Sequence, residues 1–172
     1  MFEKIKAFDK NIIAYIDNKF SCKTMDKIMK VVTFIGDYGL VWASLIIYLF
    51  VKGKTLEGLA LLCSLGTTSL LNEKILKKIF KRTRPANEFD YKNLVIKIPT
   101  SYSFPSGHTA TAFSVVPLAM SFGGVLGILS IIVASIIGFS RVYLKVHYLT
   151  DVLVGSVIGT SMSIITYLII FI

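Results

Sequence analysis

The longest uncharged stretch in the chain, residues 109–140, limits the possible folds more than any other feature of the sequence. It runs for 32 residues without an Asp, Glu, Lys, Arg or His. A single α-helix of that length would measure about 48 Å, whereas the hydrocarbon core of a bilayer is about 30 Å thick. The sequence Ser121-Phe122-Gly123-Gly124 near its middle favours a tight turn. We therefore expect two shorter spans that are joined at this turn.

Three further apolar stretches have nearly the length of a membrane-spanning helix, which is about 20 residues. They cover residues 31–51, with Asp37 charged, residues 55–71, with Glu57 near the start, and residues 152–172, with no charge. Only 17% of all residues are charged and 54% are hydrophobic, whereas about a quarter are charged in soluble domains. The sequence predicts an all-α, polytopic membrane helical bundle with about five transmembrane helices.

The N-terminal residues predict an amphipathic helix that lies on the membrane surface. Apolar side chains recur at roughly helical spacing between lysines; they are Phe2, Ile5, Ile12, Ile13, Ile16 and Phe20, among Lys4, Lys6, Lys10 and Lys19. The alternative is a solvated arm that packs on the rest of the protein. Because no continuous apolar core precedes a small-residue cleavage site, we expect no signal peptide. We treat residues 1–30 as an interfacial segment of a single domain, residues 1–172.

The charge balance agrees with a membrane location. The net charge is +9, from 19 Lys and Arg against 10 Asp and Glu. In a soluble protein this excess would suggest nucleic acid, but here the basic residues gather at the ends of apolar stretches, where they suit anionic lipid headgroups or phosphate. Cys22 and Cys63 fit neither a disulfide framework nor a zinc site.

The first of three clusters of reactive side chains lies in the long polar region 72–105, which we expect to be a loop on the catalytic face. Lys77 and the Arg84-Pro85 pair are separated by six residues. On a helix, two cations seven apart project to one side and suit a phosphoryl group. The alternative is that they are positive anchors at the membrane edge, to which we assign Lys74, Lys78, Lys81 and Arg82.

The second cluster is Pro105-Ser106-Gly107-His108, directly before an apolar stretch. Ser106 is a good N-cap for a helix that begins there, and backbone N–H groups at a helix start attract anions. Gly107 would let an oxyanion approach the main chain, and His108 has the chemistry of a general acid. Alone, this cluster would favour the alternative, a Pro-Ser-Gly turn with a solvated histidine.

The third cluster is Ser140-Arg141, followed by His147 and Asp151. His147 and Asp151 are four apart and would share one face of a helix, so that the carboxylate could accept the imidazole N–H and orient a nucleophilic histidine. Arg141 offers a planar fork for phosphate oxygens. The alternative is a His–Asp pair that caps the last span.

The three clusters share a membrane face only if the chain turns at residues 121–124. With that turn, the first cluster follows the second span, the second precedes the third span, and the third joins the last two. Without it, the second and third clusters would lie on opposite faces.

In this order, K-x6-R-P, P-S-G-H and S-R-x5-H-x3-D resemble the signature of the type 2 phosphatidic acid phosphatase superfamily, without a departure, over residues 77–151. The resemblance implies that His147 becomes phosphohistidine, that Asp151 orients it, and that His108 protonates the leaving group. It also implies that phosphate oxygens are held by Lys77, Arg84, Ser106, Gly107 and Arg141. Many relatives have six spans. We expect five spans here and, in addition to them, the amphipathic N-terminal helix.

The activity that this resemblance implies is metal-independent hydrolysis of a lipid phosphate or diphosphate. Candidate substrates are undecaprenyl diphosphate, phosphatidylglycerophosphate, phosphatidic acid and lipid A phosphate. We expect no cofactor, and the lipid substrate and the bilayer as partners, not nucleic acid; no pattern specifies an oligomeric state. One alternative is a lipid-to-lipid phosphotransferase that uses the same phosphohistidine. Related haloperoxidases are generally soluble, which the spans argue against. An inactive lipid-binding protein would be marked by the loss of His147, His108 or Asp151, and all are present.

The orientation in the membrane is predicted differently by charge and by resemblance. Seven Lys precede residue 31 and ten further Lys and Arg lie on the catalytic face, against Lys52 and Lys54 on the other. The positive-inside tendency would put the site in the cytoplasm. The resemblance puts it outside, and we follow it because several of these cations match the phosphate-binding motif. We expect a multi-pass protein of the inner (cytoplasmic) cell membrane with an extracytoplasmic active site.

Overall fold

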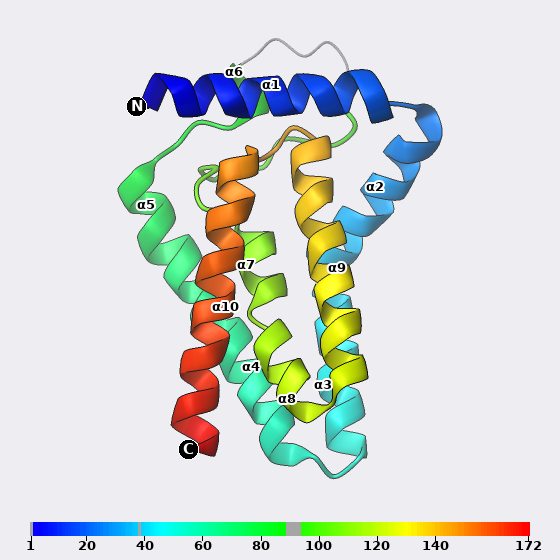
Figure 1. The fold of residues 1–172 in the computed structure, drawn as a ribbon, viewed down its shortest axis with the longest axis vertical. Coiled ribbons are helices and arrows are strands. Elements are labelled where there is room, and N and C mark those ends of the chain that lie inside the picture. The colour runs from blue at the N-terminus through cyan, green and yellow to red at the C-terminus, as the bar shows by residue number, and fades with distance from the viewer. Residues whose placement is uncertain (1, 38, 89–93) are drawn as a thin grey trace.

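Helices make up the architecture of the part of the chain that the structure describes (Figure 1). The computed structural model describes residues 2–37, 39–88 and 94–172, and no β-strand occurs among them. In chain order the helices are α1 (Phe2–Phe20), α2 (Lys23–Asp37), α3 (Leu40–Val51), α4 (Thr55–Leu70), the π-helical turn η1 (Leu71–Leu76), α5 (Lys77–Phe80), α6 (Pro85–Glu88), α7 (Gly107–Phe113), α8 (Val116–Phe122), α9 (Gly124–Tyr143) and α10 (Leu149–Phe171). The expected all-α class is confirmed.

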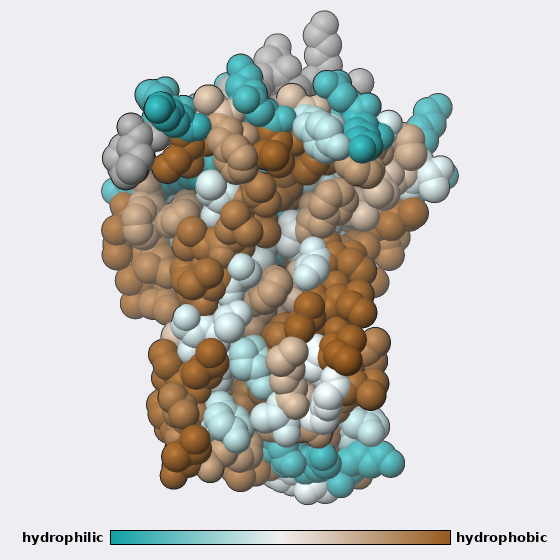
Figure 2. Space-filling model, viewed as in Figure 1, coloured by the Kyte–Doolittle hydropathy of each residue, from teal (hydrophilic) through white to brown (hydrophobic). Residues whose placement is uncertain are grey.

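The face of the bundle seen in Figure 2 has a hydrophobic band between two hydrophilic ends. Helix α1 lies across one end, roughly perpendicular to α9 and α10 (Figure 1). Figure 2 shows hydrophilic side chains gathered at the α1 end and at the far end, with a mostly hydrophobic surface between them. This is the distribution that a bilayer requires, since charged groups are costly in hydrocarbon. The predicted N-terminal helix is confirmed as α1, which ends at Phe20, and α2 then enters the bundle.

Helix length and apolarity identify fewer spans than we expected. Within the described ranges, α9 and α10 are long and apolar enough to cross a bilayer, and α2 with α3 adds a third span if this pair, bent by 48°, counts as one. The expected span over residues 31–51 therefore corresponds to the second part of α2 and to α3, with a bend between them. Gly39, which precedes α3, has a left-handed φ of 59°, which favours glycine. The helix that begins with α4 continues through η1 and α5, so the predicted loop 72–105 starts as a helix.

The long uncharged stretch does break where the sequence predicted. Helix α8 ends at Phe122, Gly123 lies between the helices, and α9 begins at Gly124. The first half of this uncharged stretch is also interrupted, between α7 and α8, where Pro117 occupies the first turn of α8. Proline suits that position because the first N–H groups of a helix need no partner within the helix. The third expected span is thus two short helices.

Two glycines of α10 allow α7 to pack against it at very short range. A Cβ atom at Gly159 would lie 2.1 Å from the carbonyl oxygen of Ala110, and one at Gly155 would lie 2.7 Å from that of Ser106. Small residues allow such close backbone approach in membrane bundles. At the start of both helices, the Ser106 N–H donates to the Asp151 carbonyl over 3.1 Å. This contact brings the second and third sequence clusters together.

Helix α1 covers the connection between α9 and α10. Ile13 and Ile16 are buried in a cluster with Val142, Leu144 and Val146. Apolar burial of this kind holds a surface helix in place. The N-terminal helix therefore covers the connection that carries His147.

The close contact of α7 with α10 predicts that Gly159→Ala destabilises the protein. Alanine favours a helix over glycine by about 1 kcal/mol, but overpacking at this contact typically costs about 1–3 kcal/mol. The midpoint of thermal unfolding in detergent should fall by several degrees. Gly66→Ala is the matched control, because Gly66 also lies inside a helix and a Cβ there meets nothing within 4 Å. An equal effect of both variants would contradict the packing argument.

Candidate active site

Backbone hydrogen bonds bring the three sequence clusters together beneath α1. Lys81, with a left-handed φ of 45°, ends α5. After it, the Ala86 N–H donates to the Lys145 carbonyl and the Ser103 N–H donates to the Arg82 carbonyl, over 3.0 and 2.9 Å. These bonds tie the segment after α5 to the α9–α10 connection and to the segment before α7.

His147 is buried, with only 1% of its surface exposed, and faces Arg84 through one ring nitrogen. Its Nε2 lies 3.1 Å from Nη1 of Arg84. A guanidinium can only donate hydrogen bonds, so Nε2 is the unprotonated nitrogen and the neutral ring carries its proton on Nδ1. Burial lowers the pKa of His147 well below its usual range, and the positive charges of Arg141, Arg84 and Lys77 lower it further. The ring is therefore a neutral base whose Nε2 lone pair faces Arg84.

Asp151 faces the other nitrogen of His147, but the two residues do not share a helix face as we expected. His147 precedes α10, Tyr148 is its N-cap, and Asp151 lies in its first turn. The Tyr148 N–H donates to Oδ2 of Asp151 over 2.9 Å, and the same oxygen lies 3.6 Å from Nδ1 of His147. This distance is longer than a hydrogen bond, so the carboxylate faces the ring without bonding to it.

Every donor of Arg84 is used within the protein. Nε donates to the carbonyl of Ser101 at 2.8 Å, and Nη2 donates to the Ser101 hydroxyl at 3.1 Å and to the Tyr102 carbonyl at 3.3 Å. Nη1 donates to the Val146 carbonyl at 2.8 Å besides its contact with His147. A guanidinium has five N–H groups in a fixed plane, so these contacts fix its orientation toward Nε2.

Lys77 meets Arg84 at the hydroxyl of Ser101. The ammonium of Lys77 donates to Oε1 of Glu73 at 2.5 Å and to Oγ of Ser101 at 3.2 Å. Burial lowers the pKa of Lys77, while the bond to Glu73 acts in the opposite direction. The two cations do not share a helix face as the sequence spacing suggested, because α5 ends at Phe80 before Arg84. They converge because the chain turns back after α5.

The second cluster starts a helix, as predicted. Ser106 is the N-cap of α7, and its hydroxyl accepts the Thr109 N–H over 3.4 Å. Packing also favours glycine at position 107, because a Cβ there would lie 2.7 Å from Oε1 of Glu73 and 3.1 Å from Nδ2 of Asn72. Arg141 is also buried nearby, and its Nη1 donates to the hydroxyl of Thr33 on α2.

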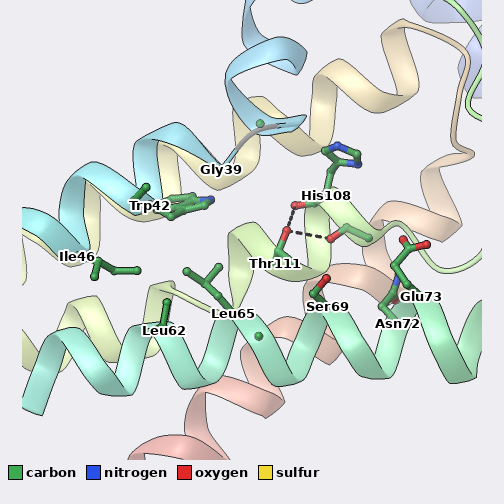
Figure 3. Close-up of a pocket in the computed structure, with 14 residues that line it drawn as sticks. Gly39, Trp42, Ile46, Leu62, Leu65, Ser69, Asn72, Glu73, His108 and Thr111 are labelled. Atoms are coloured by element: carbon green, nitrogen blue, oxygen red, sulfur yellow. Dashed lines mark hydrogen bonds between the residues drawn. The ribbon is translucent and has the colours of Figure 1, made fainter.

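His108 lines a cavity of about 460 Å³ between α3, α4 and α7 (Figure 3). The cavity has a polar end, at Glu73, Asn72 and His108, and an apolar end. The apolar end is lined by Trp42, Ile46, Leu62 and Leu65. His147 is not among the lining residues. The cavity therefore extends from the His108 side of the site toward the apolar interior of the bundle.

Four residues of this site were missed in the sequence or assigned wrongly. Arg82 was assigned to the membrane-edge anchors, but its guanidinium pairs with Asp9 and Asp151, each over 2.7 Å. Asp9 could have been noticed in the sequence because it lies four positions before Ile13. An acidic residue would therefore fall on the apolar face of the N-terminal helix. Glu73 and Ser101 had no such signal, because a carboxylate or hydroxyl in a polar region is ordinary. Lys74, Lys78 and Lys81 are exposed, as expected of anchors.

No group of three or more His, Cys, Asp or Glu side chains is placed to hold a metal ion among residues 2–37, 39–88 and 94–172.

Sequence comparison finds membrane phosphatases. A model of the PAP2 superfamily matches residues 57–172. Phosphatidylglycerophosphatase B of Bacillus subtilis (strain 168) is 34% identical over 149 residues, which cover 78% of this chain and 70% of the relative. Undecaprenyl-diphosphatase of Sulfolobus acidocaldarius is 31% identical over 137 residues, which cover 77% of this chain and 66% of the relative.

Comparison of structures agrees. The crystal structure of a transmembrane PAP2 type phosphatidylglycerolphosphate phosphatase from Bacillus subtilis superimposes with a TM-score of 0.80 at 30% identity, over 96% of this chain and 86% of that one. The crystal structure of Aquifex aeolicus LpxE gives a TM-score of 0.78 at 30% identity, over 91% and 92% of the two chains.

The geometry of His147 predicts its protonation state, which can be measured because the chain has only two histidines. In the His108→Gln variant labelled with 15N-histidine, NMR should show one imidazole with a protonated Nδ1 and an unprotonated Nε2. Because the pKa of His147 is lowered, this neutral form should persist as the pH falls through 6.5, and the imidazolium should form only below that value. Titration at or above pH 6.5, or a proton on Nε2, would contradict the assignment.

Proposed function

The chain belongs to the PAP2 superfamily, and from this premise we propose that it hydrolyses its substrate through a phosphohistidine formed on Nε2 of His147. It is a multi-pass membrane protein and a lipid phosphatase, as its relatives indicate. The observation that carries the proposal is the buried neutral imidazole, with Nε2 beside Arg84 and Nδ1 facing Asp151.

The reaction follows from this geometry in two steps. Nε2 of His147 forms a bond to phosphorus, the bond from phosphorus to the leaving oxygen breaks, and that oxygen takes a proton from His108. A water oxygen then forms a bond to phosphorus and gives a proton to His108, the bond from phosphorus to Nε2 breaks, and inorganic phosphate and neutral His147 are released. Asp151 stabilises the positive charge that develops on the His147 ring.

The phosphate is held by cations that the fold has already buried. Lys77 and Arg84 converge on the Ser101 hydroxyl, and an oxygen of the phosphate would take the place of that hydroxyl. Arg141, Ser106 and Gly107 are the other residues that we propose hold the phosphate oxygens. Donors that are fixed before the reaction stabilise developing negative charge more strongly than donors that must reorganise.

The cavity beside His108 supports a lipid as the leaving group. Its polar end is next to the proposed acid, and its apolar end lies among α3 and α4 side chains that suit a hydrocarbon chain. We therefore propose that the lipid part of the substrate leaves on the His108 side. Phosphatidylglycerophosphate, undecaprenyl diphosphate, phosphatidic acid and lipid A phosphate are the candidates. Transfer of the phosphoryl group to a lipid hydroxyl is the second candidate reaction, and analysis of the products would separate it from hydrolysis.

The proposed mechanism predicts the effects of replacing each histidine. His147→Ala should abolish turnover and also the acid-labile, alkali-stable 32P label that wild-type protein acquires from a 32P-labelled lipid phosphate. His108→Ala should retain some label but lower turnover by about 10²–10⁴-fold, most for the poorest leaving group. Wild-type activity of His147→Ala would exclude the mechanism. A panel of purified lipid phosphates in the same assay would identify the preferred substrate.

We propose that the active site faces the extracytoplasmic side of the cytoplasmic membrane. After Cys22 and Cys63 are replaced by serine, Lys97→Cys and Ser121→Cys should report opposite sides, because they lie at opposite ends of α7 and α8. An impermeant maleimide applied to intact cells should label the variant at position 97 and spare the variant at position 121. Labelling only at 121 would reverse the orientation, and labelling of both would contradict a membrane crossing by α7 and α8.

A further inference from the structure

We propose that Asp9 of the N-terminal helix is a positioning residue for the catalytic step. Asp9 engages one arm of the Arg82 guanidinium, so that only the other arm reaches Asp151 and the second oxygen of Asp151 stays available to His147. This inference rests on the proposed function, since it concerns the same histidine.

Asp9 is a fully buried carboxylate with well-defined donors. Its relative exposure is 0%. Oδ1 accepts the Thr150 N–H over 3.1 Å, and Oδ2 accepts the Thr150 hydroxyl over 2.6 Å and Nη2 of Arg82 over 2.7 Å. This one side chain of α1 thus contacts both α10 and the segment after α5.

Arg82 is divided between two carboxylates. Nη2 donates to Asp9, and Nη1 donates to Oδ1 of Asp151 over 2.7 Å and to the Thr150 hydroxyl over 2.8 Å. The guanidinium carbon lies 3.9 Å from the centre of the Tyr148 ring, which supports the plane of the fork from one face. Since Oδ1 of Asp151 is taken by Arg82, Oδ2 is the oxygen that faces His147.

The stability of the fold does not explain why position 9 is an acid. Burying a charge is costly, and well-packed apolar residues often stabilise a protein at least as well as a buried ion pair. Ile13 and Ile16 already provide apolar contacts for α1. An acid at position 9 has a consequence that an apolar side chain lacks, because it competes with Asp151 for the guanidinium.

Without this competitor, Arg82 would bind Asp151 differently. Arginine and a carboxylate prefer a bidentate pair, in which both oxygens accept from the fork. In that arrangement Oδ2 of Asp151 would turn toward Arg82 and away from Nδ1 of His147. The orienting contact would be lost, although Lys77, Arg84 and Arg141 would still hold the phosphate.

The test is a double-mutant cycle with Asp151. Asp9→Asn keeps the shape of the side chain but removes the charge, and it should lower kcat by about tenfold to a hundredfold with KM nearly unchanged. Asp151→Asn should lower kcat further. In the Asp151→Asn background, adding Asp9→Asn should have no further effect, because Asp9 acts only through Asp151. Arg82→Lys, which keeps the charge but cannot bridge two carboxylates, should reproduce the Asp9→Asn phenotype.

Asp17→Asn is the matched control. Asp17 also lies on α1 and pairs with Lys145 of the α9–α10 connection over 2.8 Å, but it does not contact Arg82. Its replacement should change kcat by less than about twofold.

Three results would overturn the inference. They are wild-type kcat in Asp9→Asn, an equal loss in Asp17→Asn, and a multiplicative loss in the double variant, which would show that Asp9 only anchors α1. Full activity of Asp151→Asn would instead overturn the proposed function. Failure of the Asp9 test with an inactive Asp151→Asn would leave that function intact.

Discussion

The contact between Arg84 and His147 is the interaction on which the rest of the site depends. A buried guanidinium at 3.1 Å from an imidazole nitrogen is favourable only when that nitrogen carries a lone pair. The contact therefore selects the neutral ring, sets the proton on Nδ1 and directs Nε2 toward the cations that we propose hold the phosphate. It also requires that a residue after α5 and a residue before α10 lie side by side, which no local structure can achieve.

The fold meets that requirement by packing short helices closely. The glycines at positions 155 and 159 let α7 approach α10, so that the Ser106 N–H reaches the Asp151 carbonyl. The turn after α5 then brings Arg82 and Arg84 beneath α1. Gly155, Gly159 and Lys81, whose φ is left-handed, thus help to bring cations from three segments together. Burial lowers the pKa of Lys77 and of His147.

The N-terminal helix has two roles in this arrangement. Its lysine-rich face suits the lipid headgroup region, while Ile13 and Ile16 cover the connection that carries His147. Because this helix covers the site at its end of the bundle, the route that we propose for substrate is from the side of the bundle. The cavity between α3 and α4, polar near His108 and apolar beyond it, has the chemical character that such a route requires.

The sequence by itself determined the helical membrane class, the break at Gly123, the N-cap at Ser106 and the three clusters of candidate site residues. These follow from hydropathy, from helix and turn preferences and from motifs, each of which depends on residues that are close in the chain. The sequence did not determine the bend between α2 and α3, the end of α5 before Arg84, or the partners of Arg82. Asp9 and Arg82 are 73 positions apart, and Asp9 and Thr150 are 141 apart. The partner of a buried charge depends on which distant segments meet when the chain packs, so only the tertiary structure decided that Asp9 on the surface helix and Asp151 of α10 would share Arg82.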